Sequence, residues 1–377
     1  MQKIIAKRLK AAREEKGLTQ QQLSDQLGFN DRQTLAAIET GQRKVSAEEL
    51  IEIMRILEKD LDYFTDPYRL DGEGKFSWRA ADGADETLAQ FELRASKWLA
   101  LYRALSKEKS GTDWYSSPYA LSLNPRSTYE EAHLAAERLA ADWKLGDAPA
   151  QNLEAAIQEK LRTLVLHVDA PEGISGAAFK LPEMNAILVN RNEPEGRRNF
   201  DLAHELFHLL TWETIKPAHT EFGMLNPKGR PEQLANCFAS ALLMPERLVN
   251  PPWPGESMAR EDGAIVYMLT GPREATRQLL NNRARKLRVS TPALQWRLVQ
   301  LGVMKKADVD PELDWFKEFG NATPAPRPFN AEYTRLLHEA LAAGRLSVRR
   351  AAAVLEMSLE ELAALFTQYN LDVPFDI

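Results

Sequence analysis

Apolar positions in this 377-residue chain recur mostly at the three- and four-residue spacing of amphipathic helices. Residues 197–210 carry such a stripe, so they are expected to form a helix with one buried face. A second apolar run begins near residue 232 and stops at Pro245, which cannot continue a helix. Short apolar runs indicate strands at residues 164–168, 176–179 and 185–190. The order of these elements predicts a mainly helical α+β fold with a short antiparallel sheet.

The first 65 residues predict a bundle of four short helices separated by tight turns. The polar residues expected to cap helix N-termini are Thr19, Asn30 and Ser46, and the glycines expected to end helices are Gly17, Gly28 and Gly41. Glu49 stands three residues after Ser46 and completes a capping box. A short helix, a tight turn and another short helix form the helix-turn-helix arrangement.

Two stretches of this bundle, L-T-Q-x-x-L at residues 18–23 and I-E-T-G-x-R at residues 38–43, resemble the Cro/repressor-type helix-turn-helix family. The resemblance implies that residues 1–65 bind double-stranded DNA. Charge agrees with this, because residues 1–44 hold nine Lys/Arg and five Asp/Glu in a protein of net charge −6. A helical module that binds protein instead of DNA is the alternative.

The third predicted helix supplies the side chains expected to read DNA. Arg32, Gln33 and Thr34 open it, and Arg and Gln are the residue types that pair bidentately with guanine and adenine in the major groove. Arg43 and Lys44 follow this helix and suit contacts to phosphate.

The helix expected at residues 197–210 contains the pattern H-E-x-x-H. At 3.6 residues per turn, His204 and His208 lie on one face, where two imidazoles can hold one Zn²⁺. Glu205 beside them can act as a general base on water. A helix with two hydrogen-bonded histidines is the alternative, but polar groups on a core helix cost free energy unless they find partners. A metal would supply those partners.

A catalytic zinc takes three protein ligands, so a third ligand is expected elsewhere in the chain. Glu232 is the best candidate, and Asn236 lies one helical turn further on, where it can orient one of the histidines. A solvated carboxylate in a first helical turn is the alternative for Glu232. His219 lies in the loop between the two helices and is a candidate donor to the oxyanion of the reaction, although a plain loop histidine is the commoner case.

The motif R-x-x-F-x-x-A-H-E-L-x-H at residues 197–208, followed by E-x-x-x-N-x-F-A-x-x-L-L-M-P at residues 232–245, resembles the ImmA/IrrE family of zinc metallopeptidases. These bacterial proteases are similar to the gluzincins and cut transcriptional repressors. The resemblance implies one Zn²⁺ per chain, held by His204, His208 and Glu232, with Glu205 as general base. Phe207 departs from the glycine that many members carry there, but the ligand spacing is intact.

The composition of the chain limits its possible surface charge, its disulfide content and its cellular location. A net charge of −6 argues against a uniformly basic surface that coats nucleic acid. The single cysteine, Cys237, excludes an intramolecular disulfide and is expected to be a core residue. No run approaches the roughly 18–20 apolar residues of a membrane span, and the N-terminus lacks the apolar core of a signal peptide. We therefore expect a cytoplasmic protein without a membrane partner.

Linker-like stretches divide the chain into expected segments. These are a helix-turn-helix domain (1–65), a linker and connector helix (66–126), a zincin-like metallopeptidase domain (127–250), a helical extension (251–321), and a linker with a C-terminal helical module (322–377). Residues 86–108 predict one amphipathic helix, which is a connector or a contact in a homodimer. The arginines near residues 345–350 are expected to accompany packing within the chain more than DNA contact.

Two functions fit these features. The first is a DNA-binding zinc endopeptidase of a bacterial regulatory or stress-response system, which cuts a transcriptional repressor or itself. The second is a helix-turn-helix transcriptional regulator whose zinc site is structural, sensory or autoregulatory. Glu205 favours the first, because a structural zinc site does not need a general base.

Overall fold

The computed structural model describes residues 2–70, 73–110, 119–222, 229–249, 273–315 and 324–376. Residues 251–272 and 316–321 of the expected helical extension, and residues 322–323 of the linker that follows it, lie outside these ranges. The chain divides into two compact units, which are described one at a time. Unit 1 comprises Met1–Lys75, Ala89–Trp114 and Ala331–Ile377, and unit 2 comprises Phe76–Leu88 and Tyr115–Asn330.

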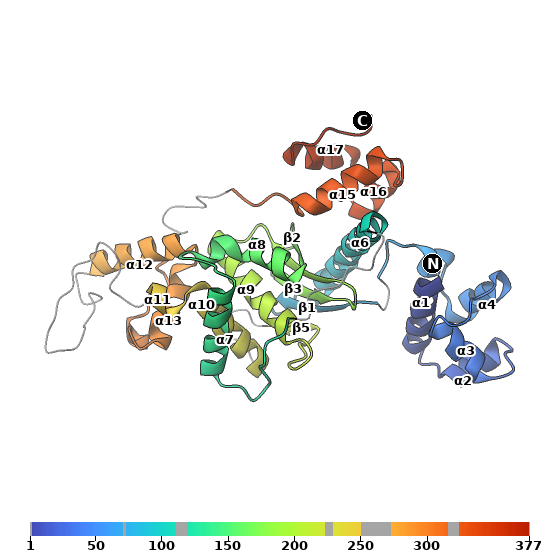
Figure 1. Cartoon of the computed structure of the whole chain (residues 1–377), viewed down its shortest axis with the longest axis horizontal. Coiled ribbons are helices and arrows are strands. Elements are labelled where there is room, and N and C mark those ends of the chain that lie inside the picture. Colours follow the sequence, from blue (N-terminus) through green and yellow to red (C-terminus); the bar gives the residue numbers. More distant parts are fainter. Residues whose placement is uncertain are drawn as a thin grey trace. The chain divides into compact units, whose positions relative to one another are not determined.

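Unit 1 begins with the predicted helical bundle (Figure 1). Its helices are α1 (Gln2–Glu15), α2 (Gln20–Gln26), α3 (Arg32–Glu39), α4 (Ala47–Leu57) and α5 (Leu61–Thr65). Thr19 and Ser46 each form a capping box, which confirms the predicted starts of α2 and α4. The cap predicted at Asn30 is wrong by one residue, because Asp31 accepts the hydrogen bond from the Thr34 backbone N–H. A carboxylate therefore starts α3.

A buried ion pair joins α1 to α3 inside this bundle. Arg13 donates from Nε and Nη2 to the two carboxylate oxygens of Glu39, at 2.6 and 3.1 Å. Gln20, at the start of α2, donates to the same carboxylate at 2.8 Å. The apolar side chains around the helices, such as Leu9, Leu23 and Ile38, are fully buried. The pair thus fixes how three helices meet around one core.

The later parts of unit 1 form a second group of helices. They are α6 (Asp85–Ser110, in this unit from residue 89), α15 (Ala331–Ala342), α16 (Val348–Leu355) and α17 (Leu359–Gln368). The hydroxyl of Tyr333 donates to the carbonyl of Trp98 at 3.1 Å, and Trp98 Nε1 donates to the carbonyl of Leu355 at 3.4 Å. The guanidinium of Arg350 pairs with Asp66. The C-terminal helices therefore pack on α6, as their apolar faces predict.

Unit 2 contains a five-stranded sheet among the described residues. Its strands are β1 (Lys75–Ala80), β2 (Leu164–Val168), β3 (Ile174–Lys180), β4 (Asn185–Asn190) and β5 (Thr220–Phe222), in the order β2-β4-β3-β1-β5. The three strands predicted from the sequence are confirmed, but the expectation of an antiparallel sheet is wrong. β3 and β4 are antiparallel, whereas β2–β4 and β1–β5 are parallel pairs, so the sheet is mixed.

Strand β1 lies inside the segment expected to be a linker and connector helix, residues 66–126. Its sequence, K-F-S-W-R-A, alternates apolar and polar residues, which indicates at most a half-exposed strand. In the structure its last five residues are all buried, Ser77 and Arg79 included. The polar residues Ser77 and Arg79 made this segment look half-exposed in the sequence, whereas the strand is buried on both faces.

The helices of unit 2 cover this sheet and one another. They are α7 (Tyr129–Asp142), α8 (Pro149–Leu161), α9 (Glu195–Thr211), α10 (Arg230–Leu243), α11 (Glu246–Val249), α12 (Arg273–Leu287) and α13 (Thr291–Gln300), with a 3-10 turn η2 (Lys306–Asp308). The N-cap of α7 is Thr128, which forms a capping box with Glu131. α9 packs on β3 and β4, and α10 packs on α9 and α7.

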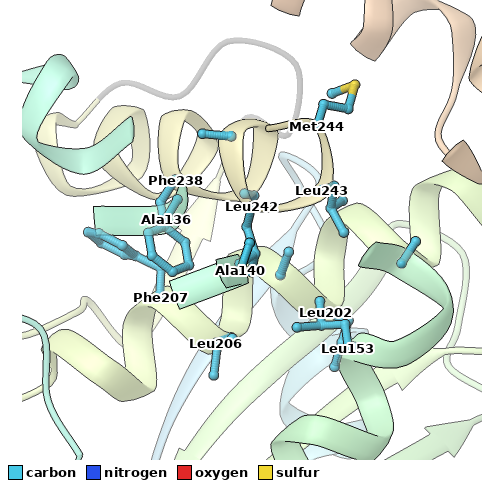
Figure 2. Packing of buried hydrophobic residues seen from close by; sticks show 14 of the residues in the cluster. Ala136, Ala140, Leu153, Leu202, Leu206, Phe207, Phe238, Leu242, Leu243 and Met244 are labelled. Atoms are coloured by element: carbon cyan, nitrogen blue, oxygen red, sulfur yellow. The ribbon is translucent and has the colours of Figure 1, made fainter. Parts of the chain in front are cut away.

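One hydrophobic core joins the segments of unit 2. Figure 2 shows Phe207 of α9 facing Phe238 of α10, and their ring centroids are 5.5 Å apart. Leu280 of α12 and Leu298 of α13 belong to the same core. The described part of the segment expected to be a helical extension therefore shares its core with α9, which carries the H-E-x-x-H motif, and with α10. The class inferred from the sequence, α+β and mainly helical with an N-terminal helix-turn-helix bundle, is confirmed.

The Arg13–Glu39 ion pair leads to a stability prediction for a fragment of residues 1–70. We expect Glu39→Ala to lower the free energy of unfolding by about 3–5 kcal/mol, because Arg13 then stays buried without its charged partner. The double variant Arg13→Met/Glu39→Leu should lose much less, since no charge is left buried. Urea unfolding followed by circular dichroism measures both values. Equal losses in the single and the double variant would contradict this account.

Candidate metal centre

Helix α9 carries the three residues of the H-E-x-x-H motif into the interior of unit 2. Its apolar residues face the core on one side and the sheet on the other, so the helix is buried along most of its length. His204, Glu205 and His208 are each only 1% exposed. Three ionisable side chains in such a place need compensating partners, because burial disfavours unsatisfied polar groups.

The third side chain at this point comes from α10. Glu232, in the first turn of that helix, is 4% exposed. Its carboxylate oxygens lie 3.0 Å from Nε2 of His204 and 3.0 Å from Nε2 of His208. The two Nε2 atoms are themselves 3.0 Å apart. Residues 28 positions apart in the chain thus direct three ligand atoms at one point, as the sequence predicts for a metal site.

Asn236 sets the orientation of one imidazole. Its side-chain oxygen lies 2.9 Å from Nδ1 of His204, so Nδ1–H donates and the Nε2 lone pair is directed at the common point. Burial, and then the positive charge of Arg79, lower the pKa of His204 to about 4. The imidazole is therefore neutral at physiological pH, which is the form that binds a metal.

Glu205 is the one member of the motif that is not part of this convergence. Neither of its carboxylate oxygens has a hydrogen-bond partner among the described residues. Burial raises the pKa of this carboxyl to about 8. A cation held by His204, His208 and Glu232 would lower that pKa, since a nearby positive charge favours the carboxylate. The unpartnered carboxyl and the donor set of two imidazoles and one carboxylate therefore fit a Zn²⁺ ion.

A second group of charges next to the motif was not predicted. Arg79 of β1 donates to Oδ1 of Asp201 at 2.6 Å, and Arg197 donates to Oδ2 of the same carboxylate at 3.2 Å. Asp201 is fully buried and lies one turn before Glu205 on α9. The spacing of Arg197 and Asp201, i and i+4, signals their pairing on a helix. Arg79 is 122 residues from Asp201, and the sequence offers no signal for that contact.

His219 lies in the exposed segment just before β5. Its Nδ1 is 3.0 Å from the Thr220 hydroxyl, and its carbonyl accepts a hydrogen bond from the Trp78 backbone N–H. The role of oxyanion donor stays a prediction. His167 of β2 has its Nε2 at 2.9 Å from a carboxylate oxygen of Glu154. Cys237 is partly buried and packs against the core, and burial raises the pKa of its thiol, which makes it a weak nucleophile.

The residues expected to read DNA lie around the start of α3 and after its end. Arg32 and Gln33 are exposed in the first turn of α3, Thr34 is half-buried, and Lys44 is exposed. Arg43 forms an ion pair with Glu49 at 2.7 Å, and its hydrogen bond lowers the pKa of that carboxyl. A phosphate contact by Arg43 would therefore compete with Glu49. The interface itself stays a prediction.

The fold and the donor set define a helix-turn-helix protein with a buried His/His/Glu metal-ligand group of the H-E-x-x-H type. Comparison with protein families finds a match for the helix-turn-helix bundle and another for the region that carries the metal-ligand group. Residues 9–64 match the helix-turn-helix family, and residues 158–298 match the IrrE N-terminal-like domain of the M78 peptidases. The chain thus carries a helix-turn-helix domain similar to the Cro/repressor type and a second domain similar to that of IrrE and ImmA. A comparison with curated proteins found no match.

Among the described residues, no helix is both long enough and apolar enough to cross a membrane.

The convergence of ligand atoms predicts the metal content. We expect about one Zn²⁺ per chain in purified protein and none in His204→Ala or His208→Ala, because each removes one of three ligands. Asn236→Ala should weaken binding about 10- to 100-fold by freeing the His204 ring. Metal analysis after dialysis and competition with a chromophoric chelator measure these effects. His219→Ala, in the exposed segment, is the matched control and should keep its zinc. Full metal retention in both ligand variants would refute the site.

The placement of Arg32 and Lys44 predicts two different effects on DNA binding. Arg32→Ala should cost about 1–3 kcal/mol at one base position and relax the preference there, because it removes a contact to a base edge. Lys44→Ala should weaken all sequences alike and reduce the salt dependence by about one counterion. Selection from a random duplex library, with salt titrations by fluorescence anisotropy, separates the two. Loss of preference in Lys44→Ala and not in Arg32→Ala would reverse the assignment.

Proposed function

We propose that this protein is a zinc-dependent endopeptidase that binds double-stranded DNA and cuts a transcriptional regulator. The observation that carries the proposal is the buried carboxyl of Glu205, which has no hydrogen-bond partner among the described residues and lies beside the convergent His204, His208 and Glu232. A structural zinc site satisfies its ligands and has no use for such a group. A hydrolytic site needs a general base at this place. The match to the M78 peptidase domain supports the same conclusion.

Each residue of the site has its own role in the proposed reaction. His204, His208 and Glu232 would hold the zinc, and Asn236 keeps the His204 ring in the tautomer that directs Nε2 toward it. When bound, the zinc polarises the scissile carbonyl and lowers the pKa of water at the site. Glu205 takes the proton from that water and passes it to the leaving amine. The apolar surroundings of α9 keep bulk water away from the proton transfer.

The DNA-binding domain has a direct use in this function. It brings the peptidase to a duplex where a DNA-bound repressor is the substrate, which raises the effective concentration toward the millimolar range of tethered pairs. This needs no conformational change, so we favour it over self-cleavage. The helix-turn-helix domain of this chain is itself the rival substrate. A homodimer, as many helix-turn-helix proteins form, would let one chain cut another.

The role of Glu205 leads to a test of catalysis. Glu205→Gln should keep about one zinc per chain and lose cleavage by at least a factor of about 1000, because the amide cannot accept the proton. Purified repressors and the protein itself are the substrates, and intact-mass analysis detects the fragments. Glu159→Gln, which changes an exposed carboxylate on α8, is the matched control and should cleave normally. Cleavage by Glu205→Gln at the normal rate would exclude the proposed mechanism.

Adding duplex DNA and deleting residues 1–65 test the link between the two domains. DNA that contains the binding site should speed repressor cleavage about 10- to 100-fold, and the deletion should remove this effect without removing the basal activity. Fragments of the protein itself that vanish in Glu205→Gln would establish self-processing instead. A rate that responds neither to DNA nor to the deletion would show that the domains act independently.

A further inference from the structure

Strand β1 lies inside the sheet of unit 2, between β3 and β5, and five of its six residues are buried. Its backbone pairs in parallel with β5, and the Phe76 ring packs on Phe179 of β3 with ring centroids 4.6 Å apart. An inner strand that is paired on both sides and buried opens rarely. β1 is therefore a fixed reference for any element that contacts its side chains.

Arg79 of β1 makes two contacts with helix α9, which carries the H-E-x-x-H motif. Its Nη1 donates to Oδ1 of Asp201 at 2.6 Å, and its guanidinium lies over the Phe200 ring, 5.6 Å from the centroid. The ion pair is buried at both ends, with side-chain exposures of 6% and 0%. A charged hydrogen bond is strong and directional, so this contact fixes one point of α9 on the sheet.

Asp201 stands on the same face of α9 as the motif. His204, Glu205 and His208 follow it at the spacing of one helical face. Burial and then the positive charge of Arg79 lower the pKa of His204. Burial raises the pKa of Glu205, and the charges of His208 and Arg79 oppose that rise. The salt bridge therefore lies within electrostatic reach of the metal-ligand group and of the general base.

The position of α9 decides two contacts at this centre. A Cβ placed on Gly176 of β3 would lie 3.8 Å from Cγ of Glu205, so the general base is packed against the sheet. On the other side, His204 and His208 meet Glu232 of α10 at 3.0 Å. A slide or a rotation of α9 would disturb both contacts. Apolar packing alone resists such movements weakly, because the hydrophobic effect has no direction.

Stability gives no sufficient reason for a buried ion pair at this place. Removing two charges from water costs free energy that their attraction offsets only in part, and apolar residues of similar volume often stabilise as well or better. We propose that Arg79 is a positioning residue, whose salt bridge with Asp201 holds α9 where the metal ligands converge and the general base lies against β3. This inference rests on the metal centre of the proposed function.

Arg197 provides the matched control. It donates to the second oxygen of the Asp201 carboxylate at 3.2 Å, but it belongs to α9 itself and cannot fix the helix to the sheet. Arg79→Gln should weaken zinc binding at least about tenfold, whereas Arg197→Gln should stay within about twofold of the unchanged protein. Competition with a chromophoric chelator measures these affinities in the full-length protein. Equal zinc affinity in Arg79→Gln and the unchanged protein would overturn the proposal.

The double variant Arg79→Met/Asp201→Leu separates positioning from stability. It leaves no buried charge unpaired, since Arg197 is 25% exposed and can reach water, so its urea midpoint should lie near that of the unchanged protein and above that of Arg79→Gln. Zinc should still bind at least about tenfold more weakly. The absorption spectrum of Co²⁺ at the site should also change, because it reports ligand geometry. Normal zinc affinity with a normal Co²⁺ spectrum would mean that the pair only stabilises the fold, which refutes the positioning role.

Nitrogen-15 NMR of labelled histidines tests the same point without metal. In the metal-free unchanged protein and in Arg197→Gln, His204 should show one neutral form with its proton on Nδ1, which donates to Asn236. Arg79→Gln and the double variant should show both neutral tautomers, because the displaced ring loses this partner. A single Nδ1–H form in every variant would contradict the positioning role. An unchanged protein that shows this form but binds no zinc would contradict the proposed function instead.

Discussion

The convergence of His204, His208 and Glu232 within 3.0 Å is the constraint on which the rest of unit 2 depends. Three ligand atoms this close inside a protein repel one another or compete for protons unless a cation or a shared proton compensates them. The fold holds them there by packing α9 on the sheet and α10 on α9, with Phe207 and Phe238 in contact. Large apolar burial thus stabilises an arrangement that the polar groups alone would not adopt.

The two units use buried charge in different ways. In the helical bundle, both carboxylate oxygens of Glu39 accept hydrogen bonds, so this carboxylate stabilises the structure and has no oxygen left to accept a proton. In unit 2, Asp201 is satisfied in the same manner by two arginines, while Glu205, one turn along the helix, is left without a partner among the described residues. Adjacent turns of one helix therefore carry one carboxylate whose hydrogen bonds are satisfied and one whose hydrogen bonds are not satisfied by the described residues. The difference lies in which partners the surrounding segments supply.

Local patterns in the sequence predicted what local physics determines. The spacing of His204 and His208, the capping boxes at Thr19 and Ser46, and the three apolar strands all depend on neighbours within a few residues. Glu232 and Asn236 were found because a helix repeats its faces every turn. Strand β1 and Arg79 could not be found, because their burial depends on partners more than 90 residues away. The mixed sheet was missed for the same reason, since β1 and β5 pair with strands that no turn connects to them.

The path of the chain between the units has a consequence for how such a protein can be built or divided. It passes from unit 1 to unit 2 after Lys75, returns after Leu88, leaves again after Trp114 and comes back after Asn330. Neither unit is a continuous stretch, so no single cut separates them. The helix-turn-helix bundle alone, α1 to α5, ends before β1 and can be exchanged at one junction, but an exchange of all of unit 1 needs several junctions. The later helices of unit 1 are therefore constrained to change together with unit 2, whereas the DNA-binding bundle is free to be replaced as a block.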